Sequence, residues 1–272
     1  MAESKAPADL RRLLDGAREL AEDAGDRILD IYRKGFTVEH KADSTPVTDA
    51  DMAAHDLIAA GLHRLDPDIP VLSEESDPIP FATRRRWRRH WLVDPLDGTR
   101  QFVRHNDDFA VNIALVEGHI PVLGVIHAPV AGTTFWATKG GGAYRGGART
   151  QSAQRLRVRV YRSGPVRVLV SRAPPGILLQ RFLDRLGEFE LRRVGSSLKS
   201  CLIAEGSADL YPRFGPTGEW DTAAAQILLE EAGGHLTDTR LSPLRYNTRD
   251  SLINPHFFAY CDAEADWSRF LD

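Results

Sequence analysis

The chain has 272 residues, of which 42% are hydrophobic and 27% are charged, an ordinary composition for a globular protein with a sizeable core. Its formal net charge of -3 gives no general attraction to nucleic acid or to anionic membranes, so a bound anion must be held by a local site. The sequence begins without the apolar run of a signal peptide and contains no stretch of about 18 apolar residues that could span a bilayer. We therefore expect a cytoplasmic protein without a transmembrane segment, with a small-molecule partner rather than nucleic acid.

Two amphipathic helices are predicted at the beginning of the chain. Apolar residues recur at helical spacing from about residue 9 to residue 34. A second helix can be capped by Thr48 or Asp49 and should run to about Leu65, where an Asp-Pro pair stops it.

The middle of the chain changes to short, apolar, β-branched runs. These runs lie between residues 91 and 138, with turns at 117–118 and 130–132, and they predict an antiparallel meander. The second half then alternates strands and helices, expected at 166–172, 177–187, 190–195, from about 197, 208–212, 221–233 and 257–261. We expect a single unit made of an α+β subdomain (1–150) and an α/β subdomain (151–272).

The segment WLVDPLDGTR at 91–100 places two carboxylates at the end of a predicted strand. At about 4 Å and an effective dielectric constant near 20, like charges repel by about 4 kcal/mol, so either one carboxylate is protonated or a cation lies between them. Oxygen ligands favour Mg2+, and the backbone N–H groups of Gly98 and Thr99 could hold an anion beside it. The alternative is that Asp94 and Asp97 only form a turn and a helix cap.

Other acids strengthen the metal hypothesis. Glu74 and Glu75 follow a short apolar strand in VLSEES, and Asp221 lies at a helix start in EWDTAAA. Each could be a cap or a surface acid. Taken together, the acid clusters are typical of a metal site for phosphoryl transfer.

A second candidate anion site lies in the segment GSSLK. Gly195, Ser196 and Ser197 stand at a predicted helix start, with Lys199 one turn further. An ordinary serine cap with a surface lysine is the alternative. Arg213 follows a later strand and would suit a phosphate.

Two further features have simpler interpretations. The basic run TRRRWRRHW at 83–91 is short and the net charge is negative, so we expect a solvated helix with Trp87 packed inward rather than a nucleic-acid site. Cys201 and Cys261 are too few for a structural zinc site, and we expect both to be reduced packing residues.

The ordered motifs resemble those of a known family. WLVDPLDGTRQF fits the pattern W-x-x-D-P-x-D-G-T-x-x-F, and EWDTAAA fits W-D-x-A-A, of the inositol monophosphatase superfamily of lithium-sensitive, Mg2+-dependent phosphatases. The resemblance extends over nearly the whole chain and is greatest to the bacterial CysQ-type 3'(2'),5'-bisphosphate nucleotidases, through TPVTDADMAAH, VLSEES and GSSLKSCLIAEGSADLYPRFGPT. It implies a layered αβαβα sandwich.

The resemblance also implies residue roles. Two or three Mg2+ ions would be held by Glu74, Asp94, the Leu96 carbonyl, Asp97 and Asp221. Asp51 and Thr99 would orient and deprotonate the attacking water. Glu75 would be a neighbouring or surface acid, and Lys41 would lie in a mobile loop that closes over the site unless it is only a solvated lysine.

The implied activity is hydrolysis of the 3'-phosphate of 3'-phosphoadenosine 5'-phosphate, which gives AMP and phosphate by direct attack of a metal-activated water in sulfur metabolism. The substrate would contact Asp97, Gly98, Thr99, Gly195, Ser196, Lys199, Arg213 and Asp221. Inositol monophosphatase activity, fructose-1,6-bisphosphatase activity and a non-catalytic nucleotide- or metal-binding role stay open as alternatives. A peripheral association with the inner membrane is compatible with the resemblance. No segment indicates an adenine pocket.

Overall fold

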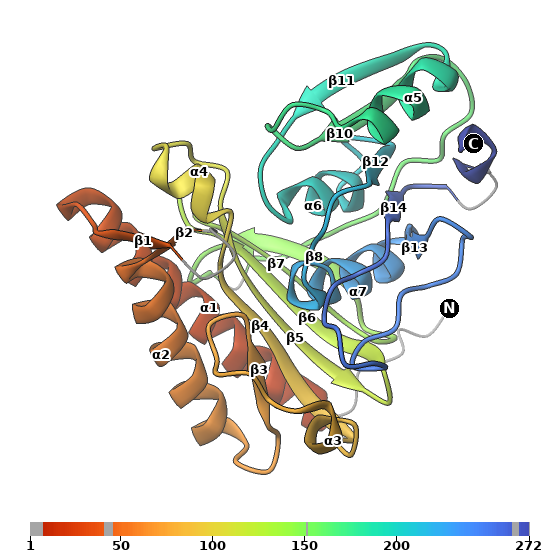
Figure 1. Cartoon of the computed structure of the whole chain (residues 1–272). Coiled ribbons are helices and arrows are strands. Elements are labelled where there is room, and N and C mark those ends of the chain that lie inside the picture. The colour runs from red at the N-terminus through yellow and green to blue at the C-terminus, as the bar shows by residue number, and fades with distance from the viewer. Residues whose placement is uncertain (1–7, 41–45, 151, 263–266, 272) are drawn as a thin grey trace.

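A computed structural model of the chain describes residues 8–40, 46–150, 152–262 and 267–271. A seven-stranded sheet, a five-stranded sheet and three sets of helices alternate in five layers, as Figure 1 shows. This arrangement confirms the predicted αβαβα sandwich. None of the described helices combines the length and apolar character needed to cross a bilayer.

The first layer consists of α1 (Ala8–Lys34) and α2 (Asp49–Leu65), which pack against each other and against the larger sheet. Both helices were predicted with nearly these limits. α2 begins with a capping box, in which the Thr48 side chain accepts from the Ala50 N–H while Asp51 accepts from the Thr48 N–H. The two short strands β1 (Val38–His40) and β2 (Pro46–Thr48) form a separate antiparallel pair between the helices.

The larger sheet has the strand order β3-β4-β5-β6-β7-β8-β9. Its strands are β3 (Val71–Ser73), β4 (Arg89–Asp97), β5 (Ala110–Glu117), β6 (Ile120–Ala128), β7 (Thr133–Thr138), β8 (Gly142–Gly147) and β9 (Gln154–Arg155). Neighbours are antiparallel except β3 and β4, so the predicted meander is confirmed. Sequence patterning missed β8 because its glycines leave no apolar alternation to detect.

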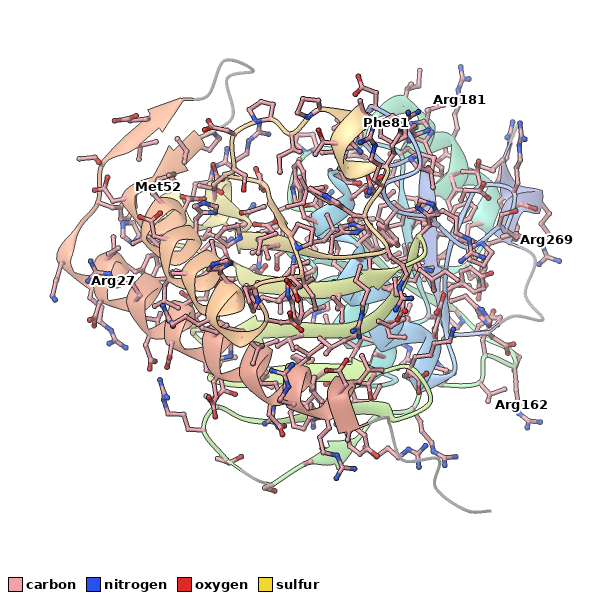
Figure 2. All side chains as sticks on the ribbon, turned by 90° about the horizontal axis from the view of Figure 1, so that it is seen from below. Arg27, Met52, Phe81, Arg162, Arg181 and Arg269 are labelled. Atoms are coloured by element: carbon pink, nitrogen blue, oxygen red, sulfur yellow. The ribbon has the colours of Figure 1, made fainter. Side chains whose placement is uncertain are left out.

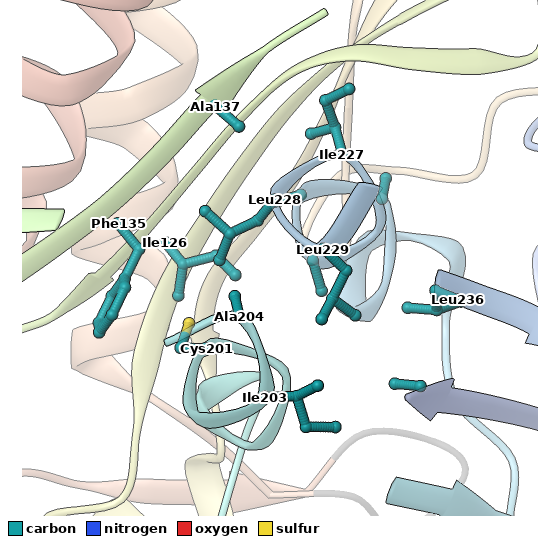
Figure 3. Packing of buried hydrophobic residues seen from close by; sticks show 14 of the residues in the cluster. Ile126, Phe135, Ala137, Cys201, Ile203, Ala204, Ile227, Leu228, Leu229 and Leu236 are labelled. Carbon is teal, nitrogen blue, oxygen red and sulfur yellow. The ribbon is translucent and has the colours of Figure 1, made fainter. Parts of the chain in front are cut away.

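The middle layer contains α6 (Leu198–Ala204) and α7 (Ala223–Ala232), which are buried between the two sheets. Figure 3 shows Ile126 and Phe135 of the larger sheet facing Cys201 of α6 and Leu228 of α7. Contact between α7 and β6 is close because Gly124 has no side chain: a Cβ atom there would lie 2.7 Å from the Ala224 carbonyl oxygen.

The smaller sheet has the order β11-β10-β12-β14-β13. Its strands are β10 (Val166–Val170), β11 (Phe189–Arg193), β12 (Leu210–Arg213), β13 (His235–Asp238) and β14 (Phe257–Tyr260). α5 (Ile177–Leu186) and the short helix η2 (Trp267–Phe270) cover its outer face, where Phe182, Phe258 and Trp267 form a separate apolar cluster. The division of the chain into two subdomains near residue 150 stays a proposal; it lies just before β9, the last strand of the larger sheet.

The expected solvated helix at residues 83–91 is wrong. Helix α3 (Phe81–Arg84) has only four residues, and the chain joins β4 at Arg89, where pairing with β5 extends the sheet. Arg84 is 2% exposed because its guanidinium donates to the Asn247 side chain at 2.6 Å and to the backbone carbonyl of Asp250. Trp87 does pack inward against the core between the sheets.

Candidate active site

A cavity of about 310 Å³ opens between the two sheets, where β4 ends and α6 begins. It brings together segments that lie more than 100 residues apart in the sequence. The predicted site residues that line it are Glu74, Asp94, Leu96, Asp97, Gly98, Thr99, Gly195, Ser196, Lys199, Arg213 and Asp221.

One wall of the cavity, which we call the acidic wall, carries the three carboxylates of Glu74, Asp94 and Asp221. Glu74 directly follows β3 and Asp94 lies in β4, and the parallel pairing of these strands, with Ser73 opposite Val93, brings the two acids side by side. Asp221 ends the short helix η1 (Glu219–Asp221), just before α7. One oxygen atom from each of the three lies within 4.8 Å of the others.

The electrostatics of this wall favour a bound cation. Burial raises the pKa of Asp94 well above its ordinary value, and the charges of Glu74, Asp97 and Asp221 raise it further. Burial, followed by the charges of Asp97 and Glu74, raises the pKa of Asp221 to about 8. A divalent ion would relieve this repulsion, and a donor set made only of oxygen atoms suits Mg2+. The residues present therefore fit the ion.

Asp97 lies beside the three-carboxylate group rather than within it. Its Oδ2 accepts from the Ser197 backbone N–H at 2.5 Å and from the Asn112 side chain at 3.2 Å. Asp97 thus ties the end of β4 to the start of α6. Glu75, the acid expected to be a neighbour rather than a ligand, is not among the residues described as lining the cavity.

Thr99 and Asp51 are paired at the edge of the cavity. Gly98, with φ of 102°, turns the chain after β4 so that Thr99 begins helix α4 (Thr99–Val103). The Thr99 hydroxyl lies 3.0 Å from Asp51 Oδ1 and 3.2 Å from the Leu96 carbonyl oxygen. Thr48 holds the other Asp51 oxygen through its N–H and its hydroxyl. Burial raises the pKa of Asp51, and hydrogen bonds from Thr48 and Thr99 oppose that rise.

The same cavity is also lined by the cationic side chains of Lys199, Arg172 and Arg213, which we call its cationic wall. Lys199 is only 3% exposed, and its ammonium donates to the Ser196 and Val194 carbonyl oxygens at 2.5 and 3.2 Å. Burial lowers the pKa of Lys199 to about 8. Arg213 donates to the Pro216 carbonyl oxygen at 3.1 Å, while its buried Nε has no partner among the described residues. Lys199 is therefore not the surface lysine of the simpler interpretation.

Sequence reasoning missed Arg172 and Asp108, which form an ion pair next to the Gly195 turn. Arg172 lines the cavity, and its Nε donates to Asp108 Oδ2 at 2.5 Å. The Gly195 N–H donates to the same oxygen at 2.9 Å. The position of Arg172, at the end of the predicted strand VRVLVSR, was the one available signal.

A second cavity of about 390 Å³ lies next to the first and shares Ser171, Ala173, Tyr211 and Arg213 with it. Its remaining lining residues are mainly apolar and include Pro174, Pro175, Ile177, Leu178 and Phe214. Sequence patterning did not indicate this cavity, because it forms between the loop after β10 and the loop after β12. Lys41, expected in a mobile loop over the site, lies outside the described residues.

Known proteins of two kinds are similar to the chain. It is 46% identical over 247 residues to the 3'(2'),5'-bisphosphate nucleotidase CysQ of Escherichia coli O6:H1, with 90% of this chain and 98% of that one covered. It is 41% identical over 257 residues to the CysQ of Haemophilus influenzae, with 94% and 95% covered. The inositol monophosphatase structure from Anabaena has a TM-score of 0.77 at 27% identity and covers 97% of this chain and 96% of that one.

The fold and the sequence agree on one assignment. The crystal structure of CysQ from Bacteroides thetaiotaomicron, a bacterial member of the inositol monophosphatase family, has a TM-score of 0.79 at 37% identity, with 91% of this chain and 96% of that one covered. The sequence profile of the inositol monophosphatase family matches residues 9–265. The chain therefore belongs to the inositol monophosphatase family.

Proposed function

We propose that the chain is a Mg2+-dependent 3'(2'),5'-bisphosphate nucleotidase, a hydrolase that removes the 3'-phosphate of 3'-phosphoadenosine 5'-phosphate. The observation that carries the proposal is the division of one cavity into an acidic wall and a cationic wall. One phosphate can be held through metal on the first wall while the second meets cationic side chains on the other. The names of the CysQ relatives support the same substrate class.

The metal would be held on the acidic wall. We assign Glu74, Asp94 and Asp221 to a first Mg2+, with Asp97 and the Leu96 carbonyl as ligands for the second or third ion. When bound, Mg2+ would neutralise charge on the reacting phosphate and make a nearby water easier to deprotonate. Inhibition by Li+ is part of this proposal.

The proton would leave the attacking water through Thr99 and Asp51. Because the Thr99 hydroxyl donates to Asp51, its oxygen lone pair can accept a proton from water. Asp51 would then accept the hydroxyl proton, and the two hydrogen bonds from Thr48 hold the carboxylate in position for that step. Water would attack phosphorus, the bond to the ribose oxygen would break, and that oxygen would take up a proton from solvent, which gives AMP and phosphate.

The second phosphate would lie against Lys199 and Arg213, with Gly195 and Ser196 beside it. The adjacent apolar cavity has room for a flat base, and it continues the first cavity through Tyr211 and Arg213. An inositol ring carries a hydroxyl or phosphate on every carbon, and burial of these polar groups against an apolar surface would be unfavourable. These features favour a nucleotide over inositol phosphate.

A phosphate-release panel tests the proposal. With Mg2+ present, loss of one charge-assisted contact should make adenosine 3'-phosphate a poorer substrate than the bisphosphate nucleotide by about 10- to 150-fold in kcat/KM. Inositol 1-phosphate and fructose 1,6-bisphosphate should be poorer still, and excess EDTA should abolish turnover. Arg213→Glu should remove most of the preference for the second phosphate.

The alternatives give different results in the same panel. Equal or faster hydrolysis of inositol 1-phosphate would leave only a general phosphatase, and no hydrolysis with any ester would indicate a binding protein.

We also propose a cytoplasmic location.

A further inference from the structure

Asn112 is a polar residue on an otherwise apolar face of strand β5. Its neighbours on that face, Ala110, Ala114 and Val116, belong to the apolar cluster between the two sheets, and side chains two residues apart in a strand point the same way. The alternate residues of β5 pack on the opposite face, which α1 and α2 cover (Figure 2). Asn112 is 1% exposed, and an unpaired amide at such a depth would destabilise the fold. Its side chain therefore needs hydrogen-bond partners.

Both ends of the Asn112 amide have a partner at the active site. Its Nδ2 donates to Asp97 Oδ2 at 3.2 Å, and its Oδ1 accepts from the Ser197 hydroxyl at 2.7 Å. A carboxylate can only accept, so the NH2 group must face Asp97 and the amide oxygen is left for Ser197. In the pairing of β4 with β5, Asn112 lies opposite Asp94, and the register shifts between Asp94 and Asp97. The amide thus joins the end of β4 to the turn before α6.

The turn at residues 195–197 is held by carboxylates at both of its ends. The Ser197 N–H donates to Asp97 Oδ2 at 2.5 Å, and the Gly195 N–H donates to Asp108 Oδ2 at 2.9 Å. Ser196, between them, has φ of 48°, a conformation that is uncommon for residues other than glycine. Such a conformation persists only where the surrounding structure determines it. The position of the turn is therefore linked to the position of Asp97.

The two donors leave one oxygen of Asp97 available. Asn112 and the Ser197 N–H both bind Oδ2, whereas Oδ1 has no hydrogen bond to any residue that the structure describes. Asp97 lines the active-site cavity, so Oδ1 is the oxygen that a ligand in the cavity can reach without displacing a protein donor. Rotation of the carboxylate would leave two buried donors unpaired, which is unfavourable. The orientation of Asp97 is thus set before a metal binds.

We propose that Asn112 is a positioning residue for the metal site, which holds Oδ2 of Asp97 and presents Oδ1 to Mg2+, with its own amide held in place by Ser197. This inference rests on the proposed function, which assigns Asp97 to the second or third ion. Residues that hydrogen-bond to a metal ligand set its orientation and the affinity for the ion. Asn112 does not line the cavity, so it acts on the metal through Asp97 alone.

Calorimetric titration of the metal-stripped chain with Mg2+ tests the inference. Asn112→Leu removes both hydrogen bonds at similar size, so the weaker Mg2+ binding step should lose about 10- to 100-fold in affinity. The step that we assign to the acidic wall should change little. In the phosphate-release assay, the Mg2+ concentration for half-maximal activity should rise by the same factor, and saturating Mg2+ should restore most of kcat. Thr134→Val is the matched control with unchanged Mg2+ affinity, because it removes a buried hydroxyl that donates to Glu22 and does not line the cavity.

Ser197→Ala is a smaller change that tests the same link if Asn112→Leu does not fold. It deletes the hydroxyl on Asn112 but keeps the N–H on Asp97, so Mg2+ affinity should fall only several-fold. Added to Asn112→Leu, it should cause no further loss, because the hydroxyl acts through the amide. Additive losses, or unchanged Mg2+ affinity in Ser197→Ala, would overturn the inference.

The same titration distinguishes this inference from the proposed function. If the unsubstituted chain binds no Mg2+, the proposed function fails and the inference fails with it. If the unsubstituted chain binds Mg2+ and Asn112→Leu binds it equally tightly, only the inference fails, and Asn112 is a structural residue of β5.

Discussion

The two walls of the active-site cavity differ in how far their charges are compensated. On the acidic wall, Glu74, Asp94 and Asp221 crowd together, and burial, followed by the charges of neighbouring carboxylates, raises the pKa of Asp94 and Asp221. On the cationic wall, Lys199 already donates to two carbonyl oxygens and Arg172 to Asp108. The acidic wall thus requires an added cation, whereas the cationic wall is stable alone and offers only part of its charge to a ligand.

Asp94→Asn is the substitution that should have the largest effect, and it tests whether the acidic wall requires a cation. A bound metal supplies several kcal/mol of charge stabilisation, so phosphate release should fall by about 10³-fold or more. Because the substitution also relieves repulsion with Glu74 and Asp221, the metal-free protein should melt at a higher temperature than the unsubstituted chain. Calorimetry in EDTA, combined with the activity assay, checks both effects. A variant that is inactive and also less stable without metal would contradict this account of the acidic wall.

Thr99→Ala should have the next largest effect. Loss of one general-base element lowers kcat by about 10²-fold, and nucleotide affinity should change little if Thr99 acts only on the water. Steady-state kinetics and equilibrium binding of the product measure the two quantities. Thr99→Ser keeps the hydroxyl beside Asp51 and should retain most activity. Equal losses of affinity and kcat would instead show that Thr99 holds the phosphate.

Arg172→Ala tests how much of its charge the cationic wall offers to a ligand. Since Asp108 uses part of the Arg172 charge, the loss should raise KM for a bisphosphate nucleotide by about 10-fold and leave kcat nearly unchanged. Adenosine 3'-phosphate is the internal control, because it lacks the second phosphate. An equal effect on both substrates would show that Arg172 acts on the shape of the cavity rather than on the phosphate.

The smallest predicted effect is on the pH dependence of the free energy of unfolding, and it comes from a histidine that does not line the active-site cavity. His90 is 1% exposed, neither ring nitrogen has a partner among the described residues, and burial lowers its pKa to about 4. The charges of nearby His119 and Arg84 contribute to this lowering of the pKa. As the pH falls from about 6.5 to about 4, the unfolded chain binds a proton that the folded chain does not, so the free energy of unfolding should fall by up to about 3 kcal/mol.

Denaturant titrations across this pH range measure the effect of His90. In His90→Phe, the part of the pH dependence due to this residue should disappear, while His63→Gln, an exposed control, should behave like the unsubstituted chain. A His90→Phe protein with an unchanged pH profile would rule out His90 as the source.

The sequence predicted the acidic wall better than the cationic wall for a physical reason. Each acid lies directly beside a strand end or a helix start, so local patterning indicates its place. The burial of Lys199 depends instead on Tyr211 and on carbonyl oxygens that the fold brings around it. The apolar cavity likewise forms between two loops about 40 residues apart in the sequence, and neither loop alone indicates it.

The same distinction holds for the fold. α1, α2 and the β4–β7 meander were predicted because each carries a complete apolar period within its own segment. Residues 83–91 misled sequence reasoning because their charges suggested a surface helix. The partners that bury Arg84, which include Asn247, lie at the other end of the chain.

Asp108 lies between the turn at Gly98 and the turn at Gly195, and its carbonyl oxygen faces both glycines. A Cβ atom would lie 3.0 Å from that oxygen at Gly98 and 2.5 Å from it at Gly195. Any larger residue at either glycine would therefore push the turn at Gly98 away from the turn at Gly195. In the proposed function, the distance between the two phosphates of the substrate is thus fixed by backbone atoms. A redesign for longer or shorter substrates must rebuild the 106–109 loop, since exchanging side chains around the cavity leaves that spacing unchanged.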